Sequence, residues 1–409
     1  MLLDIFRDSA AVERLRASPA GPWLDGFVEW LVRREYSSHT IRAYVPAAVD
    51  FMAWVRSAGL VEDRLDQGTA LDGYRDHLSV TGRWVYRHGK ASNYYTGARR
   101  LVAYLCEAGL SHATAAREAV ELVDFRHWLC QHRGLAELTV TSYVRVIRHL
   151  IEKVGADPGR YDAASLRGFV FEQANGHSTS KAKNVVTALR NYLRFLIASG
   201  KCPPGLDEAI PRIAGWRLSS LPRYLESADL ERVIAGCDSA AAPAGRDRAV
   251  ILLLARLGLR AGDVAGLRLA DIDWQRGRLL VSGKARRETW IPLPQQVGEA
   301  ILDYLEGRPA SDVANLFINM NAPYRPITPH TVSQIACRAI VRAGVVSPSH
   351  GAHVFRHSVA TTLLRGGVAL RDIGTLLRHD SIESTAYYAK VNLDLLRTVA
   401  RPWPGRPSC

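Results

Sequence analysis

His353-Val-Phe-Arg356-His357 is the stretch that decides the fold of this chain. Toward the C-terminus, Leu376-Leu-Arg-His379 ends a short predicted helix, and Tyr388 comes nine residues after His379. Toward the N-terminus, Lys284 lies on a predicted hairpin turn, and Gly258-Leu-Arg260 lies in a predicted helix-loop-helix. Each motif alone is weak, because short patterns of this kind occur by chance. All five in this order make a specific signal.

In this order and spacing, the motifs G-L-R, hairpin lysine, H-x-x-R-H, L-L-x-H and T-x-x-Y resemble those of the tyrosine recombinases, the phage-integrase and Xer-like family. The resemblance covers about residues 220 to 409. It implies a mainly α fold with a small β-sheet, in which helical core-binding modules (SAM-like) precede a mixed α+β catalytic domain. It also implies a site-specific DNA recombinase or integrase that cleaves and rejoins strands through a 3′-phosphotyrosyl intermediate, with neither a metal nor another cofactor.

The side chains in these motifs suit an attack on a phosphodiester. Negative charge grows on the phosphate oxygens in the transition state, so a site without a metal must supply cations and hydrogen-bond donors there. Arg260 and Arg356 offer planar guanidiniums that stay charged. The hydroxyl of Tyr388 has an ordinary pKa near 10, so it needs a proton acceptor, and His353 suits that role at neutral pH. In an Arg-rich chain the alternative is that these arginines form surface ion pairs.

Other roles come from the resemblance alone. It implies that Lys284 protonates the leaving oxygen, that His379 donates to a nonbridging phosphate oxygen, and that Asp263 orients Arg260. Its T-x-x-Y spacing from Thr385 selects Tyr388 over Tyr387 as the nucleophile, leaving Tyr387 to packing. We expect His357 to have mainly a supporting role.

One residue departs from the family pattern. Arg378 stands where glycine usually precedes this histidine, which puts the local backbone path in doubt.

Two rival functions remain open from the sequence. The same chemistry would serve a nicking-closing enzyme or a resolvase of hairpin ends. A protein of a different class would assemble on DNA without cleaving it, although the complete set of six residues argues against this.

The secondary-structure pattern is helical at first and mixed later. We expect strands at Arg278–Ser282 and Glu288–Leu293 and C-terminal helices beginning at about 330, 358, 370, 383 and 392. Ser38 and Thr139 are plausible N-caps, and Gly59, Gly109 and Gly200 stand where helices end. Apolar spacing predicts helices in the first half at Leu24–Arg34, Ser38–Ala58, Ala91–Ala108, Val120–His132, Thr139–Val154 and Lys181–Ser199.

The helical half contains an internal repeat. Thr40 and Tyr44 align with Thr139 and Tyr143, and Asn93-x-x-Thr96-x-x-Arg99 aligns with Asn184-x-x-Thr187-x-x-Arg190. This favours a duplicated helical module, although similar amphipathic helices can align by chance. We therefore expect five segments: an N-terminal segment (1–19), a helical DNA-binding module (20–112), a core-binding domain (117–204), a linker (205–222) and a catalytic domain (223–409). The last ends in an amphipathic helix, Asn392–Ala400. The resemblance implies that this helix docks onto a neighbouring subunit, and the alternative is that it folds onto its own domain.

The charge balance favours DNA as the partner. The chain carries 53 Lys and Arg against 40 Asp and Glu, a net charge of +13. Such an excess favours polyanions, although a bias toward arginine could produce it without DNA binding. The resemblance adds a homotetramer on two double-stranded sites, possible joint assembly with related recombinases, and a mobile-element context. We expect phosphate contacts from Arg42, Arg99, Arg145, Lys181, Lys183 and Arg190.

The remaining composition excludes several classes. Six cysteines lack the spacing of a zinc site or of a disulfide framework. No apolar run reaches the roughly 20 residues that a membrane span needs. We expect a cytoplasmic, nucleoid-associated protein.

Overall fold

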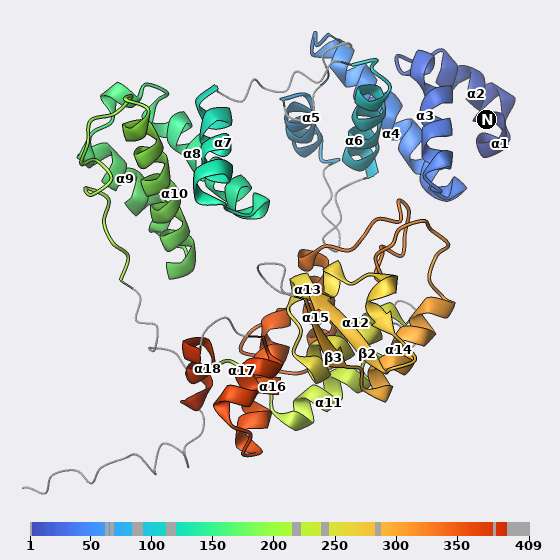
Figure 1. Cartoon of the computed structure of the whole chain (residues 1–409). Coiled ribbons are helices and arrows are strands. Elements are labelled where there is room, and N and C mark those ends of the chain that lie inside the picture. Colours follow the sequence, from blue (N-terminus) through green and yellow to red (C-terminus); the bar gives the residue numbers. More distant parts are fainter. Residues whose placement is uncertain are drawn as a thin grey trace, which may run out of the picture. The chain divides into compact units, whose positions relative to one another are not determined.

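Helices dominate this computed structural model, which describes residues 2–61, 65, 69–83, 93–111, 120–214, 222–238, 245–282, 288–378 and 382–390. The chain divides into two compact units, Met1–Val28 with Arg42–Arg217 and Glu29–Ile41 with Leu218–Cys409. The prediction of a mainly α fold with one small β-sheet is confirmed (Figure 1). None of the described helices is both long enough and apolar enough to cross a membrane.

In the described residues up to 214, the regular elements are all helices. They are α1 (Leu2–Phe6), α2 (Ser9–Arg16), α3 (Gly21–Arg33), α4 (Ser38–Ser57), α5 (Thr69–Val80), α6 (Asn93–Glu107), α7 (Val120–Arg133), α8 (Glu137–Val154), α9 (Ala163–Ala174) and α10 (Thr179–Ala198). The six predicted helices agree with α3, α4, α6, α7, α8 and α10 to within three residues. Helices α1, α2, α5 and α9 were not predicted.

The helix ends test the capping predictions. Gly59, Gly109 and Gly200 all have φ between 66° and 68°, as predicted for residues that follow a helix. Both N-cap predictions were wrong. Ser37, rather than Ser38, accepts the backbone N–H of Thr40 through its hydroxyl, and α8 begins before Thr139, with Ala136 as its cap.

The predicted repeat has a counterpart in the order of the helices. The series α3, α4, α5, α6 and the series α7, α8, α9, α10 have lengths of 13, 20, 12, 15 and 14, 18, 12, 20 residues. Aligned positions are buried in both series, for example Leu31 with Leu129 and Leu105 with Leu196. Residues from Cys202 to Ile213 pack against the core of α7 to α10, so the chain leaves that core after Ile213 rather than at 205.

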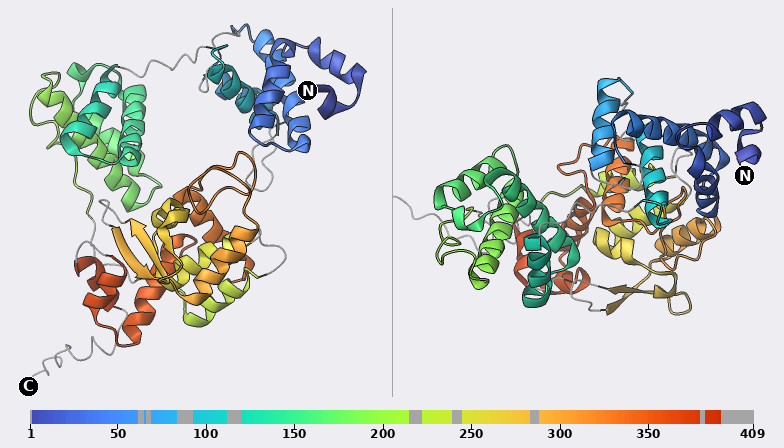
Figure 2. Two further views of the ribbon diagram at one scale, coloured as in Figure 1. Left: turned by 45° about the vertical axis from the view of Figure 1, so that its right-hand side comes forward. Right: turned by 90° about the horizontal axis from the view of Figure 1, so that it is seen from above.

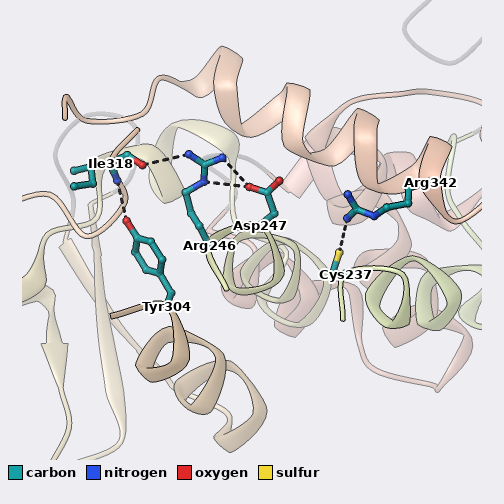
Figure 3. Close-up of polar contacts among 6 residues, drawn as sticks. All are labelled: Cys237, Arg246, Asp247, Tyr304, Ile318 and Arg342. Atoms are coloured by element: carbon teal, nitrogen blue, oxygen red, sulfur yellow. Dashed lines mark hydrogen bonds and ion pairs between the residues drawn. The ribbon is translucent and has the colours of Figure 1, made fainter. Parts of the chain in front are cut away.

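The C-terminal half is built around one buried helix, α12 (Arg246–Leu257). Every residue of α12 is buried except Arg248 and Arg256. At its N-terminus, Arg246 pairs with Asp247 and donates to the carbonyl of Ile318, which satisfies the buried charge (Figure 3). The other helices are α11 (Ser227–Ala235), α13 (Ala261–Gly266), α14 (Gln295–Glu306), α15 (Pro329–Arg342), α16 (Ala352–Arg365), α17 (Leu370–Leu376) and α18 (Ile382–Ala389).

An antiparallel sheet completes this half. Its strands β1 (Ile272–Asp273), β2 (Arg278–Ser282) and β3 (Glu288–Pro292) lie in sequence order, and Leu279 is opposite Ile291. The two predicted strands are present, whereas β1 and α14 were not predicted. Viewed from above, the strands extend out from one side of the helices, and α16, α17 and α18 gather together (Figure 2). The predicted helix at 392 lies outside the described residues.

Candidate active site

Gly258 brings the end of α12 to the candidate site. Its φ of +59° is in the left-handed region, and a Cβ there would lie 2.8 Å from Cδ2 of Leu377. Both constraints favour glycine, since other residues are strained at this φ and would push Leu377 away. The turn that follows places Arg260 just before α13.

Arg356 is buried on α16, with only 5% of its surface exposed. Its Nη1 donates to the Gly258 carbonyl at 2.7 Å, and its Nη2 donates to the Leu377 carbonyl. Burial and the nearby charge of Arg260 lower the pKa of Arg356 to about 10, although the residue still carries its charge at neutral pH. The guanidinium is therefore held rigidly by backbone carbonyls of two segments.

Arg260 and Asp263 meet the end of α17. Nη2 of Arg260 donates to the Arg378 carbonyl at 3.0 Å. The carboxylate of Asp263 accepts the backbone N–H of Arg260 at 3.2 Å and pairs with Arg378 at 2.6 Å. The carbonyls of residues 377 and 378 thus hold both predicted phosphate-binding arginines. Asp263 contacts Arg260 at its backbone N–H, and its ion pair is with Arg378.

The Tyr388 hydroxyl lies against His357. The oxygen is 2.9 Å from Nδ1 of His357, and only 2% of Tyr388 is exposed. Burial, His353 and Arg356 lower the pKa of His357 to about 4, so the ring is neutral at pH 7. Burial also raises the pKa of Tyr388, although the charge of Arg356 opposes this shift. The hydroxyl therefore rests protonated beside a neutral imidazole.

Tyr387 has different surroundings from Tyr388. It is half-buried, and the Lys390 ammonium lies 5.2 Å from the centre of its ring. The centre of its ring lies 6.1 Å from that of His357, whereas Tyr388 reaches a nitrogen of the same histidine with its hydroxyl. The two tyrosines therefore occupy different positions relative to His357, because successive residues on a helix point in different directions.

His353 lines an open pocket with Arg260 and Asp263. Loss of hydration and the charges of Arg356 and Arg260 lower the pKa of His353, although its side chain is the more exposed of the two histidines. Three other residues that line the pocket had no motif to single them out in the sequence. They are Ser282 at the end of β2 and His330 and Ser333 on α15.

Two predicted site residues, Lys284 and His379, lie outside the described residues. Their described neighbours are Ser282, which lines the pocket, and Arg378, whose φ is +53°. This left-handed conformation explains why glycine suits position 378. The backbone path at residue 378, which the sequence left in doubt, is therefore a left-handed turn.

The predicted DNA contacts lie on α4, α6, α8 and α10. All of them except Arg190 are exposed. Three of the six already contact the protein: Arg42 donates to the Ile5 carbonyl at 2.8 Å, Arg190 donates to the Ile210 carbonyl at 2.7 Å, and Nζ of Lys181 lies 2.8 Å from Nε2 of His177. In the described part of the chain, no group of three or more His, Cys, Asp or Glu side chains is placed to hold a metal ion.

Comparison with known proteins gives matches over the catalytic half and over the whole chain. Residues 223–394 match the model of the phage integrase family. A Sinorhizobium fredii protein named integrase/recombinase y4rA is 36% identical over 411 residues, which cover 97% of both chains. The tyrosine recombinase XerD of Listeria monocytogenes is 28% identical over 69% of this chain and 98% of its own length.

Solved structures share the fold. The XerH site-specific recombinase in a post-cleavage complex with a palindromic difH substrate has a TM-score of 0.54 at 20% identity, over 72% of this chain and 92% of that one. A lambda integrase tetramer bound to a Holliday junction has a TM-score of 0.53 at 19% identity, over 75% of this chain and 88% of that one.

Proposed function

This chain belongs to the phage integrase family of tyrosine recombinases, and we propose that it recombines DNA at specific sites with Tyr388 as the nucleophile. One contact supports the choice of Tyr388 as the nucleophile. Its hydroxyl lies 2.9 Å from Nδ1 of His357, and His357 is on α16, the helix that also bears Arg356. A nucleophile, a proton acceptor and a phosphate-binding cation are therefore close together.

The reaction follows from these groups. The Tyr388 oxygen attacks a DNA phosphorus as its proton passes to a histidine, and Arg260 and Arg356 stabilise the charge on the phosphate oxygens. The 5′-oxygen leaves with a proton from Lys284, and His379 donates to a nonbridging oxygen. The products are a 3′-phosphotyrosyl bond and a free 5′-hydroxyl. A 5′-hydroxyl of the partner duplex reverses the step, so the bond energy is conserved.

We assign the proton of Tyr388 to His357, since this is the ring in contact with the hydroxyl. Nδ1 can accept that proton when the other ring nitrogen carries the hydrogen. His353, predicted from the sequence as the acceptor, lines the pocket and is the second candidate.

DNA is the macromolecular substrate in this proposal. Four protomers would act on two duplexes, as in the tetrameric lambda integrase complex with a Holliday junction. Residues 20–112 and 117–204 would contact DNA as two related helical modules, and residues 223–409 would carry the catalysis. Acting on DNA, the protein would work in the cytoplasm at the nucleoid, in the service of a mobile element.

One experiment both identifies the nucleophile and recovers the DNA site on which the protein acts. The protein is expressed in cells, and DNA that stays attached under denaturing conditions is recovered and sequenced. After nuclease digestion, trypsin releases residues 379–390, which contain both tyrosines. Fragmentation in the mass spectrometer then shows which tyrosine carries the nucleotide.

We expect the nucleotide on Tyr388, no attached DNA from Tyr388→Phe, and attached DNA from Tyr387→Phe. Attachment at Tyr387 would overturn the choice of nucleophile. Equal recovery of DNA from wild type and the double Phe variant would overturn the enzymatic proposal. Recombination between two duplexes that carry the recovered site separates a recombinase from an enzyme that only nicks and closes DNA.

A further inference from the structure

Arg378 occupies a position that the proposed reaction leaves without a role. Its side chain is 9% exposed, and its partner Asp263 is 7% exposed. The two residues are 115 positions apart in the chain, so the ion pair joins the end of α17 to the start of α13. Breaking one side of such a buried pair leaves an uncompensated charge, which makes the pair costly to disrupt.

The same residue contacts Arg260 by two routes. The Arg378 carbonyl accepts from Nη2 of Arg260 at 3.0 Å. Through its guanidinium, Arg378 holds the Asp263 oxygen that accepts the backbone N–H of Arg260 at 3.2 Å. Arg260 is thereby fixed at its backbone and at its side chain by one neighbouring residue.

The backbone conformation at Arg378 also indicates that its side chain has a role. A φ of +53° disfavours a side chain with a Cβ, and glycine would occupy this position without strain. Arginine is present all the same, and its guanidinium is well paired on one side. Its conformation therefore carries a cost that an interaction of the side chain must offset.

We infer that Arg378 is a positioning residue, which orients Arg260 toward the scissile phosphate by holding Asp263. This inference rests on the proposed function and deepens it. A rival role has a basis in the structure too: Nε and Nη1 of Arg378 are buried without a hydrogen-bond partner among the described residues. In this rival role, these groups bind a phosphate oxygen of the DNA directly.

A double-mutant cycle separates the two roles, because residues that act as one unit give non-additive effects. The variants are Arg378→Gly, Asp263→Asn and the pair together, in the full-length protein. The readouts are the single-turnover rate of covalent adduct formation on the recovered site, the Kd for the same duplex and the midpoint of urea unfolding.

We expect Arg378→Gly to slow adduct formation by between about tenfold and a hundredfold, as a misplaced catalytic group does. Its Kd for the duplex should change little, and the double variant should be no slower than the slower single variant. Arg378→Lys should recover most of the rate, because an ammonium can also pair with Asp263. Glycine at this φ keeps the backbone, and the Lys variant decides the question should Arg378→Gly unfold.

Three outcomes are distinct. Multiplicative losses in the double variant with a weakened Kd would overturn the inference in favour of direct phosphate binding. Wild-type rates in a folded Arg378→Gly would also overturn it, while the proposed function would stand. Failure of the wild type itself to form an adduct would overturn the proposed function.

Discussion

At the scale of single residues, the burial of His357 beside Tyr388 makes the stability of the fold depend on pH. The pKa of His357 is lowered to about 4 in the folded protein, against about 6.5 for an exposed histidine. The folded state therefore binds this proton less readily than the unfolded chain. The free energy of unfolding is therefore not reduced by this group above pH 6.5, where the ring is neutral in both states. It decreases as the pH falls from 6.5 toward 4, because only the unfolded chain then binds the proton.

We predict that wild type loses more stability than His357→Asn between pH 7.5 and pH 5. The difference should be on the order of 1 kcal/mol, after allowance for the partial exposure of the ring. Urea unfolding at the two pH values measures it, and His330→Asn is the control because His330 is exposed. Parallel losses in wild type and His357→Asn would show that the ring is not excluded from protonation by folding.

At the scale of elements, α17 organises the site. Its C-terminal carbonyls bind Arg260 and Arg356, and its side chains pack with α16 and α18 in a small cluster that includes Ile373, Leu377 and Tyr388. The contact between α17 and α18 therefore helps to fix the position of Tyr388.

We predict that Gly374→Ala impairs cleavage more than stability. A Cβ at residue 374 would lie 2.9 Å from Oγ1 of the buried Thr385, three residues before Tyr388. The crowding should cost about 1 kcal/mol, and the gain in helix propensity from Gly to Ala offsets about the same amount. The rate of adduct formation should fall severalfold while the unfolding midpoint stays nearly constant.

Gly266→Ala is the matched control, because a Cβ there meets nothing within 4 Å. It should leave the rate unchanged. A wild-type rate in Gly374→Ala would mean that Thr385 adjusts without moving Tyr388.

At the scale of the whole molecule, the net charge of +13 is expressed partly as exposed cations on the helical half. Arg145 on α8 and Lys183 on α10 both project to solvent. Cations that neutralise DNA phosphates release counterions, and each such cation adds to the dependence of affinity on salt.

We predict that the double variant Arg145→Gln with Lys183→Gln lowers the salt slope of DNA binding by about 1.8, at about 0.9 for each phosphate that is no longer neutralised. Fluorescence anisotropy with a labelled duplex between about 50 and 200 mM salt measures it. Arg194→Gln is the control, because Arg194 already pairs with Asp207 at 3.1 Å. An unchanged slope in the double variant would remove Arg145 and Lys183 from the DNA interface.

Local pattern was sufficient for the order of the motifs and for many, but not all, of the elements. Strand β2 and six helices of the first half follow from apolar spacing, because that spacing reports which face of an element is buried within a few residues. The N-caps were misplaced by one to three residues because several polar residues near a helix start can each serve as a cap. Helices α5 and α9 were missed, since the spacing of their apolar residues was not recognised as helical.

The contacts of the site were decided by tertiary structure. His357 meets Tyr388 across 31 positions, Arg356 meets Leu377 across 21, and Arg378 meets Asp263 across 115. The resemblance to the family's motifs was enough to choose Arg356 and Tyr388, whereas the histidine that contacts the tyrosine and the partner of Arg378 could not be predicted. Spacing along the chain describes neighbours on one element, but these distances depend on how α13, α16, α17 and α18 pack against one another.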